Sequence, residues 1–124
     1  MRVWDLPPEK LCPRHLLAEH YEIHTLWSVL TRGLSGWSHH PETLRWQGRL
    51  AALYARHQAD VAEMERRGYH HRSPLDATLA TGESIQTEYK DAPAEQLRQL
   101  REKCAACRER FADFNLPTGE LHHD

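Results

Sequence analysis

The stretch HLLAEHYE, which begins at His15, places two carboxylates and an imidazole close together on one predicted helix. Each helical residue advances by about 100°, so Glu19 falls inside the apolar stripe, between Leu16 and Ile23. His15 and Glu22 lie along the edge of that stripe. Carboxylates one turn apart beside apolar neighbours raise at least one pKa and can hold a proton ready for transfer. The pattern indicates either an acid–base site or a satisfied polar cluster at the edge of the core.

Three helices are predicted to position these residues. They run from Pro13 to Arg32, from Pro41 to Arg67, and from the N-cap residue Asp91 to the break at Asn115–Pro117. Proline suits the first helical position because its missing N–H has no partner there, and glycine commonly follows a helix end. The polar stretch 69–90 shows no sustained period, and no segment indicates a strand. We expect an all-α fold with long connecting loops and the N-terminal segment packed against the first helices.

Length and composition narrow the class of protein. A chain of 124 residues is expected to form one domain, residues 1–124, with a real core. No apolar run approaches the roughly 20 residues that span a bilayer, and the start lacks the apolar core of a signal peptide. A cytoplasmic protein without membrane contact is therefore expected. The net charge of −2 offers no general basic surface, although residues 45–72 hold six basic and three acidic side chains.

The cysteines and histidines are the candidate metal ligands of this chain. Cys104 and Cys107 form a CxxC pair, but they fall on the apolar stripe of the third helix and no second CxxC completes a ligand set. Packing in the core is the favoured interpretation because a free cysteine behaves as a small hydrophobic residue. Among the ten histidines, the best helical pairs are His20 with His24 and His15 with Glu19, each at i,i+4 spacing. No metal and no cofactor are expected.

The opening MRVWDLPPEKLCPRHLLAEHYEIH resembles the start of the pyrimidine dimer DNA glycosylases of the bacteriophage endonuclease V type. Their first helix carries a motif of the form HLxAEYRE, and the matching positions here are His15, Leu16, Ala18, Glu19 and Glu22. The segment LRWQGRLAALYARHQADVAEMERRGYHH is similar to their second helix and its exit. The resemblance covers roughly the first 70 residues.

The resemblance implies a compact helical enzyme that cuts the glycosidic bond of a damaged pyrimidine and then nicks the abasic site. The family's nucleophile is the terminal α-amine, which corresponds to Met1. An α-amine has a pKa of about 7.7–8.0 against about 10.4 for lysine, so a usable share is neutral at pH 7. Because Arg2 is bulky, Met1 is expected to be retained. Glu22 corresponds to the catalytic carboxylate, and Glu19 and His15 are expected to support it by orienting one another or the terminus.

The same resemblance implies contact with damaged DNA, expected to be a duplex. The candidate contact residues are Arg2, Arg14, His15, Tyr21, Arg45 and Arg49. Trp37 and Trp46 could stack on an exposed base, although a tryptophan at helical spacing more often packs in the core. Two arginines of the family motif are replaced here by Tyr21 and Thr25. The end of the chain, FNLPTGELHHD, lacks the family's aromatic, basic tail.

The leading hypothesis is a DNA repair glycosylase with abasic-site lyase activity, which needs no metal, cofactor or obligatory protein partner. A second hypothesis is a non-catalytic helical module that binds nucleic acid or protein, since the chain lacks much of the expected positive charge. A third is a His-rich helical protein that binds a metal.

Overall fold

The computed structural model describes residues 1–117, and this part of the chain is helical. Its α-helices are α1 (Pro13–Arg32), α2 (Pro41–Trp46), α3 (Leu50–Arg66), α4 (Pro93–Lys103) and α5 (Ala105–Arg110), with single 3-10 turns at Pro8–Lys10 and Ala77–Leu79. Extended pairing among the described residues is limited to one isolated bridge between Arg49 and Gly82. The predicted all-α fold class is confirmed. Residues 118–124, which end the predicted C-terminal tail, lie outside this description.

The first helix has the predicted bounds. Pro13 occupies its first turn, the Cys12 side chain caps it by accepting the His15 N–H, and Gly33 ends it in the left-handed conformation with φ 64°. Its buried face carries Leu16, Glu19, Ile23, Leu26, Trp27 and Val29. Glu19 therefore lies within the apolar face, as its phase along the helix predicted.

The predicted second helix is wrong, because the chain breaks between α2 and α3. Gln47 is extended with φ −61° and ψ 129°, and Gly48 has φ 74°. The later segment around Gly82 lies at this break and pairs with the start of α3. Here the Ala51 N–H donates to the carbonyl of Thr81 at 2.8 Å, and the Ala52 N–H donates to the carbonyl of Glu83 at 3.0 Å. A distant segment thus satisfies N–H groups that a helix start leaves free.

The backbone of Gly82 lies very close to that of Gly48 where the two segments cross, and substitution of Gly82 tests this contact. A Cβ at this position would lie 2.2 Å from the carbonyl oxygen of Gly48, and the φ of 82° disfavours any other residue. We expect Gly82→Ala to lower the free energy of unfolding by about 2 kcal/mol or more. Chemical denaturation can measure it, with Gly36→Ala as the control because a Cβ there meets nothing within 4 Å. Equal stability of the two variants would contradict the close crossing.

The predicted third helix is also divided. Ala92, not Asp91, is the N-cap of α4, and Asp91 pairs with Arg2 at 3.1 Å. The helix stops at Cys104, whose backbone is extended with φ −134° and ψ 109°. The Cys104 side chain then accepts the Cys107 N–H and caps α5. The single helix predicted for this segment is therefore two helices, α4 and α5, which are separated at Cys104.

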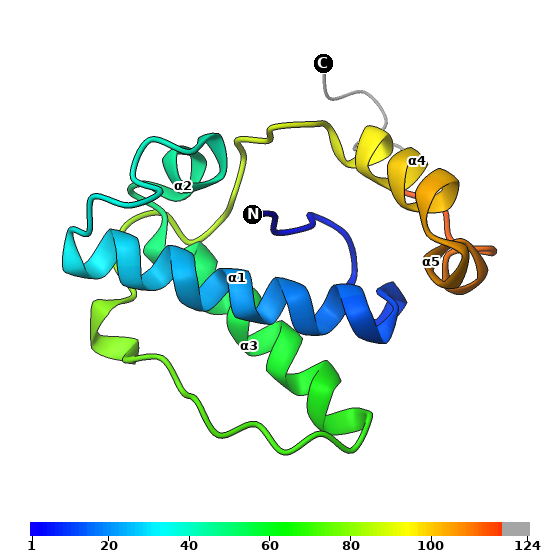
Figure 1. Ribbon diagram of the computed structural model, residues 1–124, viewed down its shortest axis with the longest axis horizontal. Coiled ribbons are helices and arrows are strands. Elements are labelled where there is room, and N and C mark those ends of the chain that lie inside the picture. The colour runs from blue at the N-terminus through cyan, green and yellow to red at the C-terminus, as the bar shows by residue number, and fades with distance from the viewer. Residues whose placement is uncertain (118–124) are drawn as a thin grey trace.

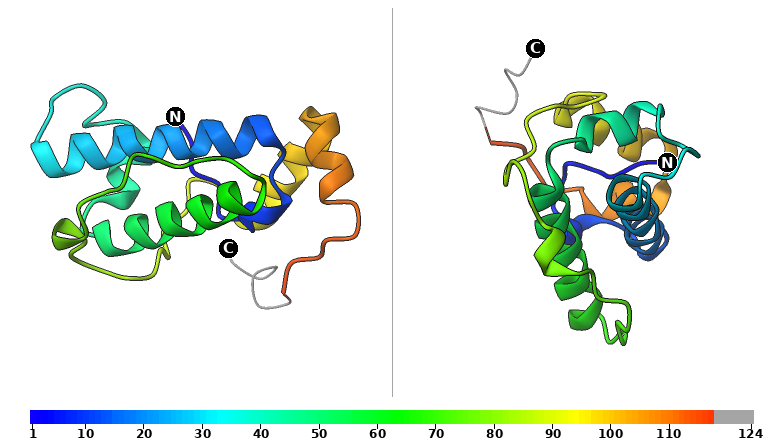
Figure 2. Two further views of the ribbon diagram at one scale, coloured as in Figure 1. Left: turned by 90° about the horizontal axis from the view of Figure 1, so that it is seen from below. Right: turned by 90° about the vertical axis from the view of Figure 1, so that its left-hand side faces the viewer.

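The helices surround the N-terminal segment. α3 crosses behind α1, and α4 and α5 lie at the end where α1 begins (Figure 1, Figure 2). Two apolar clusters form the interior. One joins Leu6, Leu11 and Leu16 to Met64, Leu97, Leu100, Cys104, Cys107 and Phe111, and the other joins Val3 to Ile23, Leu26, Trp27, Trp46 and Leu53. The predicted packing of residues before α1 against the first helices is therefore confirmed. Among the described residues, each helix is too short or too polar to cross a bilayer.

Candidate active site

The N-terminal segment is held by an unusual set of hydrogen bonds. Three consecutive backbone N–H groups, those of Val3, Trp4 and Asp5, each donate to a buried side chain. The acceptors are Glu42 of α2 at 3.2 Å, Glu19 of α1 at 2.6 Å and Gln96 of α4 at 2.8 Å. We call these three acceptors the N-terminal clamp. Because they come from three different helices, the clamp fixes the path of the chain next to the terminus (Figure 1).

Glu19 joins the terminus to the interior of the protein. It is 1% exposed, and beyond the Trp4 N–H it accepts a 2.7 Å hydrogen bond from the Arg56 guanidinium of α3. Asp60 lies 3.6 Å from the same guanidinium. Burial, and next the negative charge of Glu19, raise the pKa of Asp60 above its usual range. The raised pKa favours the protonated form of Asp60 beside the Glu19–Arg56 ion pair.

Glu42 and Arg45 of α2 also hold the N-terminal segment, a role that the sequence did not indicate for either residue. Arg45 pairs with Glu42 at 2.7 Å and with Asp5 at 3.1 Å, and it donates to the carbonyl of Val3 at 2.9 Å. It is 6% exposed and its guanidinium is taken up by these partners, and contact of Arg45 with DNA stays a prediction. The i,i+3 spacing of an acid and a base was the available signal, but it is common on solvated helices.

Met1 and Glu22 are the predicted nucleophile and catalytic carboxylate, and Glu22 lies in the middle of α1. Met1 is partly buried and packs against the apolar cluster that contains Ile23, the residue after Glu22. Arg2 lies over the Trp4 ring at 4.3 Å and pairs with Asp91. Glu22 itself is partly exposed. The arrangement brings the terminus to the middle of α1, and the chemical roles of Met1 and Glu22 remain predictions.

His15 has different neighbours from those expected. Its Nδ1 lies 3.1 Å from the Cys12 sulfur and 3.5 Å from the Cys107 sulfur, and its ring packs edge-on against Trp4. Burial, and then the charge of Arg14, lower the pKa of His15. The predicted burial of Cys104 and Cys107 is confirmed. Cys12 and His15, which are not part of a CxxC motif, lie against these two cysteines.

The remaining DNA-contact candidates differ in exposure. Arg14 is exposed, and Arg49 is largely covered and pairs with Glu88 at 3.3 Å. Tyr21 is 71% exposed and Trp37 is 61% exposed, and both line a surface pocket of about 550 Å³. Trp46 is buried, which agrees with core packing, the alternative favoured for a tryptophan at helical spacing. An aromatic surface beside α1 is therefore available to a base.

Four histidines form a second polar cluster between α1, α3 and the following loop. His24 Nε2 lies 3.2 Å from His20 Nε2 and 3.1 Å from His57 Nε2, and a ring nitrogen of His71 lies within the same group. Burial, and next the neighbouring imidazoles, lower the pKa of His20 to about 4. Neutral imidazoles are metal ligands, so this cluster could hold a transition-metal ion.

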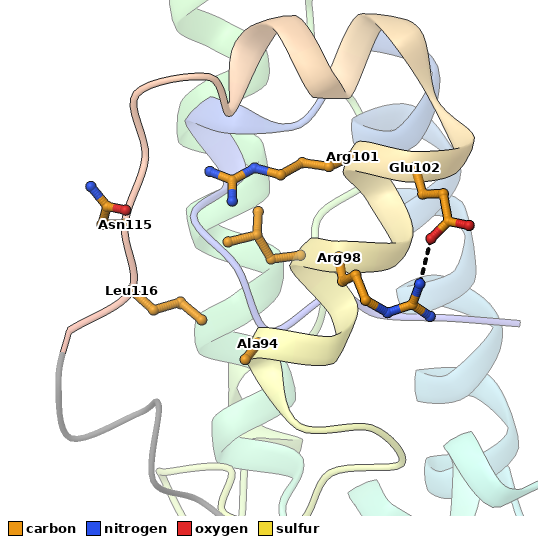
Figure 3. A pocket seen from close by; sticks show the side chains of 7 residues that line it. Ala94, Arg98, Arg101, Glu102, Asn115 and Leu116 are labelled. Atoms are coloured by element: carbon orange, nitrogen blue, oxygen red, sulfur yellow. Dashed lines mark hydrogen bonds and ion pairs between the residues drawn. The ribbon is translucent and has the colours of Figure 1, made fainter.

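A separate pocket of about 490 Å³ lies between α4 and residues 115–116 (Figure 3). Its two guanidinium groups are already engaged. Arg98 pairs with Glu95 at 2.7 Å and also with Glu102, and Arg101 donates to the carbonyls of Phe111 and Phe114. The pocket therefore offers little to a phosphate group and is not the candidate active site.

Comparison with known proteins agrees with the resemblance of the first helix. The family model described as pyrimidine dimer DNA glycosylase matches residues 1–77, which include the N-terminal segment, α1, α2 and α3. No curated protein and no solved structure matches the chain. The matched range holds Met1, Glu19, Glu22 and Glu42, while Gln96 lies beyond it. Because the match spans more than half of the 124 residues, the chain belongs to the pyrimidine dimer DNA glycosylase family.

Proposed function

We propose that this protein is a DNA repair glycosylase and abasic-site lyase that acts on damaged pyrimidines through the α-amine of Met1. The observation that carries the proposal is the N-terminal clamp. A terminal segment is usually poorly ordered unless it is tied down. Here buried carboxylates and an amide hold three successive N–H groups, so the amine two residues earlier has a defined position. Precise placement of a reacting group is a main source of enzymatic rate.

The proposed reaction uses the Met1 amine and the Glu22 carboxylate. The neutral amine attacks C1′ of the damaged nucleotide, the bond to the base breaks, and its electron pair leaves with the base. The nitrogen loses a proton, and its electron pair forms the C1′=N imine as the ring C1′–O4′ bond breaks and O4′ takes up a proton. Loss of the C2′ proton then expels the 3′-phosphate by β-elimination, which breaks the strand. Glu22 would stabilise the developing positive charge at the sugar and carry protons in these steps.

Contact with DNA would rest on few cations and on aromatic rings. Arg14 is exposed near the start of α1, and Tyr21 and Trp37 offer faces on which a base can stack. A duplex substrate would need the target nucleotide to leave the stack, and damage lowers that cost. We infer that the substrate is DNA in which the lesion itself weakens the double helix.

The test is covalent trapping with borohydride, which reduces an imine to a stable amine. Untagged protein is mixed with an oligonucleotide that carries an abasic site, and the adduct is mapped by mass spectrometry. We expect the adduct on the Met1 α-amine. A variant with Lys10, Lys90 and Lys103 changed to Arg should still be trapped, whereas added residues before Met1 should abolish trapping.

The alternative is a non-catalytic module that binds nucleic acid or protein. The net charge of −2 and the burial of Arg45 favour it over an enzyme with a strongly basic DNA face. It predicts weak binding to DNA that depends on salt and not on lesions. If a control lyase is trapped and this protein is not, the catalytic proposal fails and this alternative replaces it.

A further inference from the structure

Two short chelating pairs meet where α1 begins. Cys12 and His15 form a C-x2-H pair at the start of α1, and Cys104 and Cys107 form a C-x2-C pair at the start of α5. The four donor atoms lie within 4.8 Å of one another, although about 90 residues separate the pairs. Such spacings are typical of structural zinc sites because both residues of a pair can reach one ion.

Four of the six distances between the donor atoms lie within about 0.5 Å of those in a tetrahedral zinc site, and the other two are no longer than 4.8 Å. Zinc holds sulfur at about 2.3 Å and imidazole nitrogen at about 2.0–2.1 Å, which places neighbouring ligands about 3.4–3.8 Å apart. The Cys12 sulfur lies 3.1 Å from His15 Nδ1 and 3.9 Å from the Cys104 sulfur. His15 Nδ1 lies 3.7 Å from the Cys104 sulfur and 3.5 Å from the Cys107 sulfur. A core made only of packed thiols has no need to bring an imidazole nitrogen against three sulfurs.

We propose that Cys12, His15, Cys104 and Cys107 bind one Zn²⁺ ion in a closed structural site. Three thiolates and one imidazole are a soft donor set that suits zinc. Four protein ligands leave no open position for substrate, which distinguishes a structural site from a catalytic one. The three cysteines are buried and His15 is partly buried. This inference does not depend on the proposed lyase activity.

Backbone N–H groups support the sulfurs. The Cys12 N–H donates to the Cys107 sulfur at 3.5 Å, the His15 N–H donates to the Cys12 sulfur at 3.4 Å, and the Cys107 N–H donates to the Cys104 sulfur at 3.4 Å. Hydrogen bonds of this kind favour the charged thiolate and orient the ligand. Each of the three sulfurs therefore has a backbone donor in addition to the proposed metal.

The site would tie the C-terminal helices to the family domain. Cys12 and His15 lie within the matched range 1–77, whereas Cys104 and Cys107 lie beyond it. The His15 ring also packs against Trp4, whose N–H is held by Glu19. Zinc would thus brace the segment that leads to Met1 as well as the junction between α1 and α5.

The first experiment uses the full-length protein, produced with added zinc and without a histidine tag. We expect all three thiols to resist alkylation until a chelator removes the metal. Replacement by Co²⁺ should give the strong near-ultraviolet band of thiolate-to-cobalt charge transfer. The proposal would be overturned if protein produced with added zinc contained no zinc and its thiols reacted equally fast with and without chelator. That result would show a metal-free core.

Variants then assign the ligands. Cys107→Ser should lose one equivalent of zinc relative to the wild type and lose the cobalt band, while His24→Gln, in the four-histidine cluster, should keep the cobalt band because that cluster contains no thiolate. His15→Cys should retain zinc with a changed cobalt spectrum, which keeps the test decisive if Cys107→Ser fails to fold. Zinc that is lost in His24→Gln but kept in Cys107→Ser, together with an unchanged cobalt spectrum in His15→Cys, would place the metal elsewhere and refute the site.

Discussion

Glu22→Gln is expected to lower the rate of strand cleavage at an abasic site by about 10²–10⁴-fold, the usual contribution of a positioned acid–base group. The amide has nearly the same shape as the carboxylate but cannot carry a proton or stabilise a cation by charge. Single-turnover cleavage of an oligonucleotide with an abasic site measures the rate. Because Glu22 is partly exposed on α1, the variant is expected to keep its fold.

The control for this experiment is Glu65→Gln, at an exposed position of α3. It makes the same chemical change away from the terminus and should cleave at the wild-type rate. DNA binding by Glu22→Gln should remain close to that of the wild type, because a carboxylate does not attract phosphates. Wild-type cleavage by Glu22→Gln would remove Glu22 from the mechanism while leaving the role of the Met1 amine to be decided by trapping.

The largest stability effect is expected for the buried group of Glu19, Arg56 and Asp60. Glu19 balances the charge of Arg56, and burial together with that nearby negative charge raises the pKa of Asp60. When Glu19→Gln removes the first carboxylate, Asp60 can ionise beside Arg56 and replace it. The double variant Glu19→Gln/Asp60→Asn leaves a buried guanidinium without a partner, which costs about 3–5 kcal/mol. We therefore expect the double variant to lose more stability than the two single variants together.

Urea unfolding of the four proteins in this cycle measures the coupling, expected to be about 2 kcal/mol or more. The folded pKa of Asp60 is raised, so its contribution to stability is greatest at acid pH and declines as pH rises toward that pKa. Asp60→Asn lacks this dependence, and its stability relative to the wild type should increase with pH. Additive losses at all pH values would show that Asp60 does not replace Glu19 as the partner of Arg56.

Local signals in the sequence were sufficient to predict the first helix. Pro13 and Gly33 act through their own backbone restrictions, and the apolar period placed Glu19 in the buried face before any partner was known. The family motif lies on the same helix, so the candidate residues Glu19 and Glu22 could be named from sequence. Each of these features depends on neighbours within a few turns.

The tertiary structure decided the features that join distant residues. The break at Gly48 is paired with Gly82, and the N-terminal clamp includes Gln96, which is 91 residues from its partner Asp5. Arg45 looked available to DNA because a charged residue on a short helix usually faces solvent, but three partners from other segments surround it.

The pairs Cys12–His15 and Cys104–Cys107 also combine a local sequence pattern with a contact that only the tertiary structure decides. Each pair is visible in the sequence, and Cys104 with Cys107 could be placed in the core by periodicity alone. Their meeting with Cys12 and His15 depends on how α4 and α5 fold back onto the start of α1, and no local propensity specifies that contact. The sequence by itself determined the family, the first helix and the residue types of the site. Only long-range packing decided which carboxylates hold the terminus and which four side chains share one centre, because those contacts arise from burial and not from neighbouring residues.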